Sequence, residues 1–324
     1  RDAISFNQSL SGWDVSRVTN VGDMFRRATA FNQDISEWDV SKVINMSSMF
    51  RDAISFNQSL SGWDVSRVTN VGDMFRRATA FNQDISEWDV SKVINMSSMF
   101  RDAISFNQSL SGWDVSRVTN MGDMFCGATA FNQDLSGWDV SRVTTMGAMF
   151  YGAILFNQDL SGWDVSNVTM MRQMFYFAIA FNQDLSMWDV SSVKNMSNMF
   201  CRAVSFNQDL SGWDVSGVSL MLQMFGGATA LEAILQKSRD VSSFFEGVYR
   251  DMPREERRQA FAGVFAWQRR RAFMLFLVNH GYLYSAHVAS NFKDPSATKP
   301  SSEVVPCDAI FDVEDIVRYI CQFL

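Results

Sequence analysis

The stretch FNQDLSGWDVSRVTTMGAMF, residues 131–150, decides the fold because its pattern recurs at a fixed spacing along most of the chain. Residues 156–175, FNQDLSGWDVSNVTMMRQMF, repeat it 25 positions further on. Self-similarity at such a period is the signature of a repeat architecture. Nine units follow one another without insertion, each closing on Met-Phe, and they begin at Arg1, Arg26, Arg51, Arg76, Arg101, Cys126, Tyr151, Tyr176 and Cys201.

One 25-position template describes all nine units: x-x-A-x-x-F-N-Q-[SD]-[LI]-S-x-W-D-V-S-x-V-x-x-[VM]-x-x-M-F. Residues 1–50 recur unchanged as 51–100, which indicates either a very recent duplication or an error of sequence assembly. A tenth unit starts at Gly226 and loses the pattern at Leu231. We therefore expect a repeat solenoid over residues 1–230 and a separate carboxy-terminal region over 231–324.

The pattern within a unit predicts a short parallel strand followed by a short helix. In residues 106–111 alternation places Phe106, Gln108 and Leu110 on one face, as in a strand. From Val115 to Ala128 the apolar positions are spaced by three and four, which suits a helical turn packed on one side, either a short α-helix or a 3₁₀ segment. One unit cannot bury its apolar face alone, so stacked neighbours must supply the stability.

The segments 131–150 and 156–175 resemble the repeat of BspA-type leucine-rich-repeat surface proteins, a repeat also known from mycoplasma lipoproteins. The resemblance covers residues 1–230 and implies a leucine-rich-repeat-like solenoid with a role in surface attachment or protein binding. It favours a cell-surface or secreted location, with a cytoplasmic location as the alternative. The carboxy-terminal region departs from this family, because it continues into a helical pattern without a cell-wall anchor.

Charge and hydropathy exclude two function classes. The net charge is −7, and all of it belongs to the first 225 residues, with 23 Asp and Glu against 16 Lys and Arg. An acidic array argues against a nucleic-acid groove, which needs clustered Lys and Arg. The longest wholly apolar run near the end of the chain, Ala272 to Val278, is far shorter than the roughly 20 residues of a membrane helix.

Template position 9 is the best candidate for a partner site, because it varies only between Ser and Asp and alternation leaves it exposed. A merely solvated face explains the same pattern equally well. We call this set the Ser/Asp row. Its acidic members, the candidate binding residues, are Asp34, Asp84, Asp134, Asp159, Asp184 and Asp209, and its serines are Ser9, Ser59 and Ser109.

Two further columns have structural interpretations. The Asp of W-D-V-S, as at Asp139, would stack in a like-charged column that could hold calcium, but capping of a turn through backbone N–H groups is favoured. The Asn-Gln pairs, as at Asn132 and Gln133, should form ladders between units, while the partner of the pair that faces solvent could contact a ligand.

Catalytic and metal chemistry have little support in the sequence. The only histidines, His280 and His287, with Cys307 and Cys321, match no zinc spacing, and no nucleophile triad, phosphate loop or dinucleotide fingerprint occurs. Cys126 and Cys201 lie three units apart, beyond disulfide reach. We therefore expect no catalytic residues, no metal and no cofactor.

The carboxy-terminal pattern predicts helices over Leu231–Arg250 and from Pro253 towards His280, a loop over Asn291–Pro306 and a last helix from Asp312. These helices would cap the open end of the solenoid. The final segment is loosely similar to an F-box helix. We expect a non-catalytic protein-binding or adhesion scaffold, and the alternative is an intracellular adaptor whose repeats bind a client while the terminal helices recruit a second protein.

Overall fold

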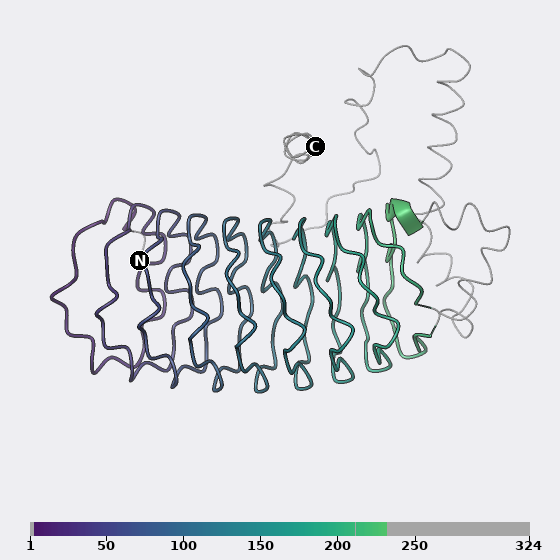
Figure 1. Cartoon of the computed structure of the whole chain (residues 1–324), viewed down its shortest axis with the longest axis horizontal. Helices are drawn as coiled ribbons and strands as arrows, with labels where there is room; N and C mark the ends of the chain where they lie inside the picture. The colour runs from purple at the N-terminus through teal and green to yellow at the C-terminus, as the bar shows by residue number, and fades with distance from the viewer. Residues whose placement is uncertain (1–2, 211, 232–324) are drawn as a thin grey trace, which may run out of the picture. The chain divides into compact units, whose positions relative to one another are not determined.

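The computed structural model describes residues 3–210 and 212–231, which form a stack of similar backbone coils (Figure 1). Each 25-residue unit makes one coil, and successive units lie side by side in chain order. The prediction of a repeat protein is confirmed. The predicted carboxy-terminal helices and their capping role lie outside the described residues, apart from a helical stretch at 229–231.

Regular strand structure in the described coils is limited to single parallel bridges at template position 20. They join each unit to the next, from Asn20↔Asn45 and Asn45↔Asn70 through the array to Asn195↔Leu220. No longer strand occurs within residues 3–210 and 212–231. The units are parallel neighbours, as expected, but one bridge per unit replaces the predicted strand.

The prediction of a short helix between Val115 and Ala128 is wrong, because this segment is a series of turns. Alternate N–H groups bond to the next unit instead of to their own segment, as in Asp123 N to Gly147 O at 2.8 Å. The groups between them close tight turns, as in Cys126 N to Asp123 O at 3.1 Å. The backbone of Asp123 has the left-handed conformation, with φ at 58°, and such a conformation interrupts a right-handed helix.

The prediction of a strand at 106–111 also fails, although the burial pattern is close to the expected one. Phe106 and Leu110 are fully buried, whereas Ser109 and Ser111 are exposed. The N–H of Asn107 donates to the side-chain oxygen of Asn82 at 2.9 Å rather than to a backbone carbonyl. The side-chain amide thus takes the place of the backbone ladder that would define a strand.

Aromatic rows running along the stack form the centre of the core. Phe50 stacks on Phe75 in the next unit with ring centroids 5.6 Å apart, and Phe50 also packs on Phe56 at 4.0 Å. Trp88 and Trp113 form a third row at 6.5 Å with nearly parallel rings. Since a ring such as Phe50 contacts its equivalents in both neighbouring units, Phe25 and Phe75, burial of one coil depends on its neighbours.

Candidate binding surface

The aspartates of the Ser/Asp row are exposed, as predicted, and each described turn fixes its carboxylate in the same way. Asp134 Oδ1 accepts the backbone N–H of Ser136 at 2.8 Å, and Asp34 makes the same bond to Ser36 at 2.9 Å. Equivalent bonds to the serine two residues on are made by Asp84, Asp159 and Asp184. Asp209 is also exposed. The structure therefore arranges five of the six candidate residues as one repeating feature, and Asp209 shares their exposure.

Serine makes a weaker form of this turn where it replaces aspartate. Ser109 Oγ accepts the N–H of Ser111 at 3.4 Å and lies 3.1 Å from the Ser111 hydroxyl. Aspartate adds charge as well as a shorter bond. The N–H and hydroxyl of Ser136 hold the pKa of the Asp134 carboxyl below its usual range, so this carboxylate is ionised at neutral pH.

The aspartates at template position 14 form a second exposed row, which we call the W-D row. Asp139 Oδ1 accepts the N–H of Ser141 at 3.0 Å, and hydrogen bonding by Ser141 lowers the pKa of Asp139. The predicted acceptance of backbone N–H groups is confirmed, although no helix follows the turn. The same bond occurs at Asp14, Asp39, Asp64, Asp89, Asp114, Asp164, Asp189 and Asp214.

A basic row at template position 17 was not identified as a candidate from the sequence, although the repeat alignment contains it. It runs through the first six units and then stops, because Asn167, Ser192 and Gly217 occupy the position in the last three. Lys92 lowers the pKa of Asp89 after the larger effect of hydrogen bonding by Ser91. The exposed members are Arg17, Lys42, Arg67, Lys92, Arg117 and Arg142.

This difference changes where the cations lie along the array. In units one to six the basic row offsets part of the charge of the W-D row, because each unit carries one cation three residues after its aspartate. In units seven to nine the aspartates of both acidic rows continue without a cation at position 17. Each of these units still carries one cation elsewhere, Arg172, Lys194 or Arg202, so its net charge is −1, as in units one, three, five and six. The Lys194 ammonium lies beside position 17 of unit nine, where it donates to the Gly217 carbonyl at 3.2 Å.

The Asn-Gln pairs form the predicted ladder. Asn107 Oδ1 accepts both the N–H of Asn132 and the side-chain amide of Gln133, each at 3.0 Å. The same pair of bonds links Asn32 to the unit that follows it, and both members of the pair are half-buried in the second to ninth units. Because the amide oxygen already takes two donors, the ladder is a structural element of the stack.

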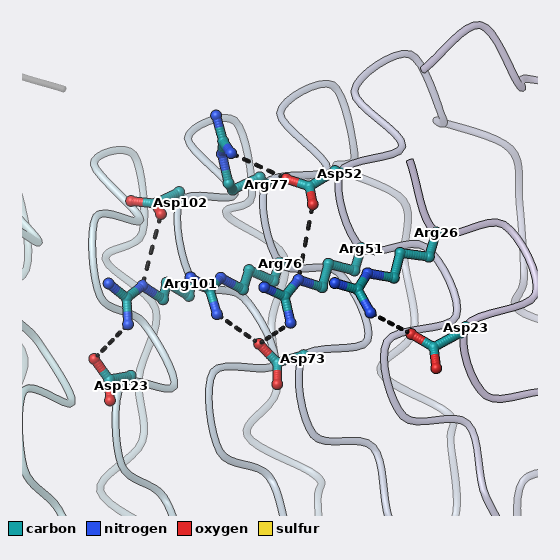
Figure 2. Close-up of polar contacts among 10 residues, drawn as sticks. All are labelled: Asp23, Arg26, Arg51, Asp52, Asp73, Arg76, Arg77, Arg101, Asp102 and Asp123. Atoms are coloured by element: carbon teal, nitrogen blue, oxygen red, sulfur yellow. Dashed lines mark hydrogen bonds and ion pairs between the residues drawn. The ribbon is translucent and has the colours of Figure 1, made fainter. Parts of the chain in front are cut away.

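An arginine column that was not predicted from the sequence lies at template position 1, where the described residues include Arg26, Arg51, Arg76 and Arg101. Figure 2 shows their guanidinium groups in one row, with Asp23, Asp73 and Asp123 along one side and Asp52 and Asp102 along the other. The column is two-thirds or more buried at each side chain, with exposed fractions between 17% and 28%. The charges are visible in the sequence, but only the stacking brings them together.

The carboxylates that pair with this column alternate because the two kinds of unit differ. Asp52 Oδ1 pairs with Arg77 from the next unit at 3.1 Å, whereas Asp73 Oδ1 pairs with Arg76 of its own turn at 3.1 Å. Position 2 carries Arg27, Asp52, Arg77 and Asp102 in turn, which avoids stacking like charges on one another. The repeated 50-residue segment thus corresponds to a two-unit electrostatic pattern.

The described residues contain no group of three or more His, Cys, Asp and Glu side chains arranged to hold a metal ion. Cys126 and Cys201 are buried and are not joined by a disulfide, as their separation predicts. No helix within the described part of the chain is long and apolar enough to cross a membrane. His280, His287, Cys307 and Cys321 lie outside the described residues.

Comparison with protein families gives one match that spans the repeats. The model described as "Mycoplasma protein of unknown function, DUF285" matches residues 1–83, 60–153 and 133–239. These overlapping matches cover most of the chain and agree with the mycoplasma part of the resemblance seen in the repeats. No curated protein matches the chain.

Proposed function

The chain belongs to the DUF285 family, and we propose that it is a non-catalytic scaffold that binds a protein or an adhesion ligand through the Ser/Asp row. The observation that carries this proposal is the presentation of Asp34, Asp84, Asp134, Asp159 and Asp184, which are exposed and held by the same turn in their units. The family description assigns no function, so the argument depends on this geometry.

A fixed row of carboxylates is suited to binding because little conformational entropy remains to be lost. Each aspartate is restrained by a bond to the following serine, and the coil behind it is bonded to both neighbours through Asn-Gln and Trp contacts. Preorganised groups lose less freedom on association than flexible ones, and this difference appears directly as affinity.

The net negative charge of the array favours a partner with a basic surface. Between residues 151 and 225 the Ser/Asp and W-D rows carry six aspartates against three cations, Arg172, Lys194 and Arg202. Complementary charge raises association rates and selects against acidic partners. We propose that the partner approaches this part of the array, so that binding weakens as ionic strength rises.

We also propose a relationship to BspA-type leucine-rich-repeat proteins. A BspA-type leucine-rich-repeat relationship would place this protein among surface-attachment or protein-binding repeats, at the cell surface or in secreted form. The parallel stacking of 25-residue coils supports that relationship. The backbone of each coil differs from the expected strand and helix, because turns take the place of both.

The test replaces Asp159, Asp184 and Asp209 together by asparagine. Asparagine keeps the oxygen that accepts the serine N–H, so the charge is removed while the turn is preserved. The full chain and this variant are used to capture partners, which are then purified and titrated against both. The matched control neutralises Asp164, Asp189 and Asp214 of the W-D row.

We expect the Ser/Asp variant to lose at least tenfold in affinity and the control to lose less. Equal affinity of the Ser/Asp variant and the original chain would exclude this row as the binding surface. A larger loss in the control would move the site to the W-D row.

A further inference from the structure

The arginine column contains one guanidinium whose ion pairs are all longer than a hydrogen bond. Arg26 Nη1 lies 3.2 Å from Asp23, and Arg76 Nη1 lies 3.1 Å from Asp73, both within hydrogen-bond distance. The contacts of Arg51 are longer: 3.7 Å from Nε to Asp52 and 3.8 Å from Nη1 to Asp73. Among the described residues, Arg51 has carboxylates near it but forms no side-chain hydrogen bond with them.

Arg51 makes longer contacts because other arginines already bond to the carboxylates near it. Asp73 already bonds to Arg76, and Asp52 already bonds to Arg77 at 3.1 Å. The position that serves Arg26 and Arg76, three residues before each arginine, is Ser48 in the turn of Arg51. Figure 2 shows the resulting interval between the carboxylates of Asp23 and Asp73 on that side of the column.

Arg101 has the same local sequence as Arg51 but lies closer to a carboxylate. It also follows a serine, Ser98, yet its Nη1 lies 3.0 Å from Asp123 in the next unit. Asp123 is available because the residue three positions after it is Cys126 rather than an arginine. Arg51 is therefore distinguished by its neighbours.

The surroundings of Arg51 make an additional anion favourable. Its side chain is 25% exposed, and its Nε atom, like those of Arg26, Arg76 and Arg101, is buried without a hydrogen-bond partner among the described residues. Burial, followed by the positive charge of Arg76, lowers the pKa of the Arg51 guanidinium, which reflects the cost of keeping this charge. A planar guanidinium fork binds the paired oxygens of phosphate and carboxylate groups.

We propose that Arg51 and Ser48, with the flanking Arg26 and Arg76, form a binding site for a tetrahedral oxyanion, either a free phosphate or a phosphate monoester. The oxyanion occupies the side of the column on which Asp23 and Asp73 lie, at the level of Ser48. Its oxygens accept hydrogen bonds from the Arg51 guanidinium and from the Ser48 hydroxyl. Several donors in a small space favour an anion with more than two oxygens over a single carboxylate.

The experiment measures the melting temperature of the full chain against inorganic phosphate, with sodium chloride of equal ionic strength as the reference. A ligand that binds only the folded state raises its stability with concentration. At a phosphate concentration ten times Kd, the expected rise is about 3–6 °C. A parallel titration with O-phosphoserine distinguishes the two sources: a response to phosphate alone assigns the free ion, and a response to both assigns a monoester.

Two variants make the test specific. Ser48→Asp supplies the carboxylate that Asp23 and Asp73 supply elsewhere, at a φ of 57° that matches theirs, so it should fold. We expect it to melt at a higher temperature without phosphate and to lose the phosphate response. Ser98→Asp is the matched control and should retain the response, because Arg51 is unchanged.

Two outcomes would overturn the proposal. One is an absence of any difference between phosphate and chloride in the original chain. The other is a phosphate response of equal size in the original chain and in Ser48→Asp, which would indicate general screening of the array. Arg51→Gln provides a second check and should also abolish the response.

Discussion

The indole N–H of Trp113 donates a hydrogen bond to the backbone carbonyl of Ile85 in the preceding unit, at 3.1 Å. The tryptophan is 3% exposed, so this carbonyl has little access to water. Every unit from the second to the ninth repeats the bond with its own tryptophan, beginning with Trp38 to Leu10. The indole thus packs in the core and also joins one coil to the next.

Replacing Trp113 by phenylalanine should reduce the free energy of unfolding by about 2–4 kcal/mol, because the Ile85 carbonyl loses its donor and a smaller ring leaves a void. Urea denaturation followed by circular dichroism measures the change. Trp13→Phe is the control, since Trp13 is 58% exposed, and should change stability by about 0.5 kcal/mol or less. Similar losses in both variants would contradict a special role for the indole bond.

The Asn-Gln ladder gives a second prediction. Asn107→Ala removes the oxygen that accepts Asn132 N and Gln133 Nε2, and should cost about 1–3 kcal/mol because two half-buried donors lose their acceptor. Asn107→Asp keeps an acceptor oxygen and should lose less in the same urea titration. The exposed neighbour Ser109→Ala should be nearly neutral. If Asn107→Ala were also neutral, the ladder would contribute nothing to stability.

At a residue with left-handed backbone, a substitution should raise the free energy of unfolding instead of lowering it. Ala148 has φ at 53°, a conformation in which its Cβ is strained and glycine is not. Ala148→Gly should therefore raise the free energy of unfolding by about 0.5–1 kcal/mol, measured by thermal and urea unfolding. Ala153→Gly is the matched control, because Ala153 is fully buried and has no positive φ, and it should destabilise. A loss of stability at Ala148 would refute the strain argument.

These backbone conformations also explain where sequence reasoning failed. The three- and four-residue spacing of Val118, Met121 and Phe125 is typical of a helix, but turns that alternate in direction bury the same residues. Fifteen of the described left-handed positions carry residues other than glycine, mostly Asp, Arg, Ser and Gln, and only three carry glycine, so composition gives no indication of them. The pattern of burial was therefore predictable, whereas the backbone path was not.

Some features of the candidate surface could also be predicted from the sequence, and others could not. Exposure of the Ser/Asp row and the turn bonds of Asp139 follow from local sequence, because both depend on residues two positions apart. The arginine column depends on contacts across 22 or 25 positions and on which carboxylate another arginine has already taken. Such competition is apparent only once the coils are stacked.

The buried thiol of Cys201 should be protected from alkylation in the folded chain. Burial raises the pKa of this thiol to about 11, partly offset by the nearby Arg202, and only the thiolate reacts rapidly with alkylating agents. At pH 8 iodoacetamide should therefore modify Cys201 in urea but hardly at all in the folded chain, as measured by mass spectrometry of the peptide that contains it. Equal modification rates in the two states would contradict this burial.

The same pKa shift determines how stability depends on pH. Below the ordinary thiol pKa of about 8.5 neither state is ionised, so the folded state has no disadvantage. As pH rises from there towards 11, the unfolded chain loses the Cys201 proton while the folded chain retains it, so the free energy of unfolding falls. Cys201→Ala should flatten this decline relative to the original chain in urea titrations between pH 8 and pH 10. An unchanged slope would assign the decline to other groups and leave the thiol without a role in it.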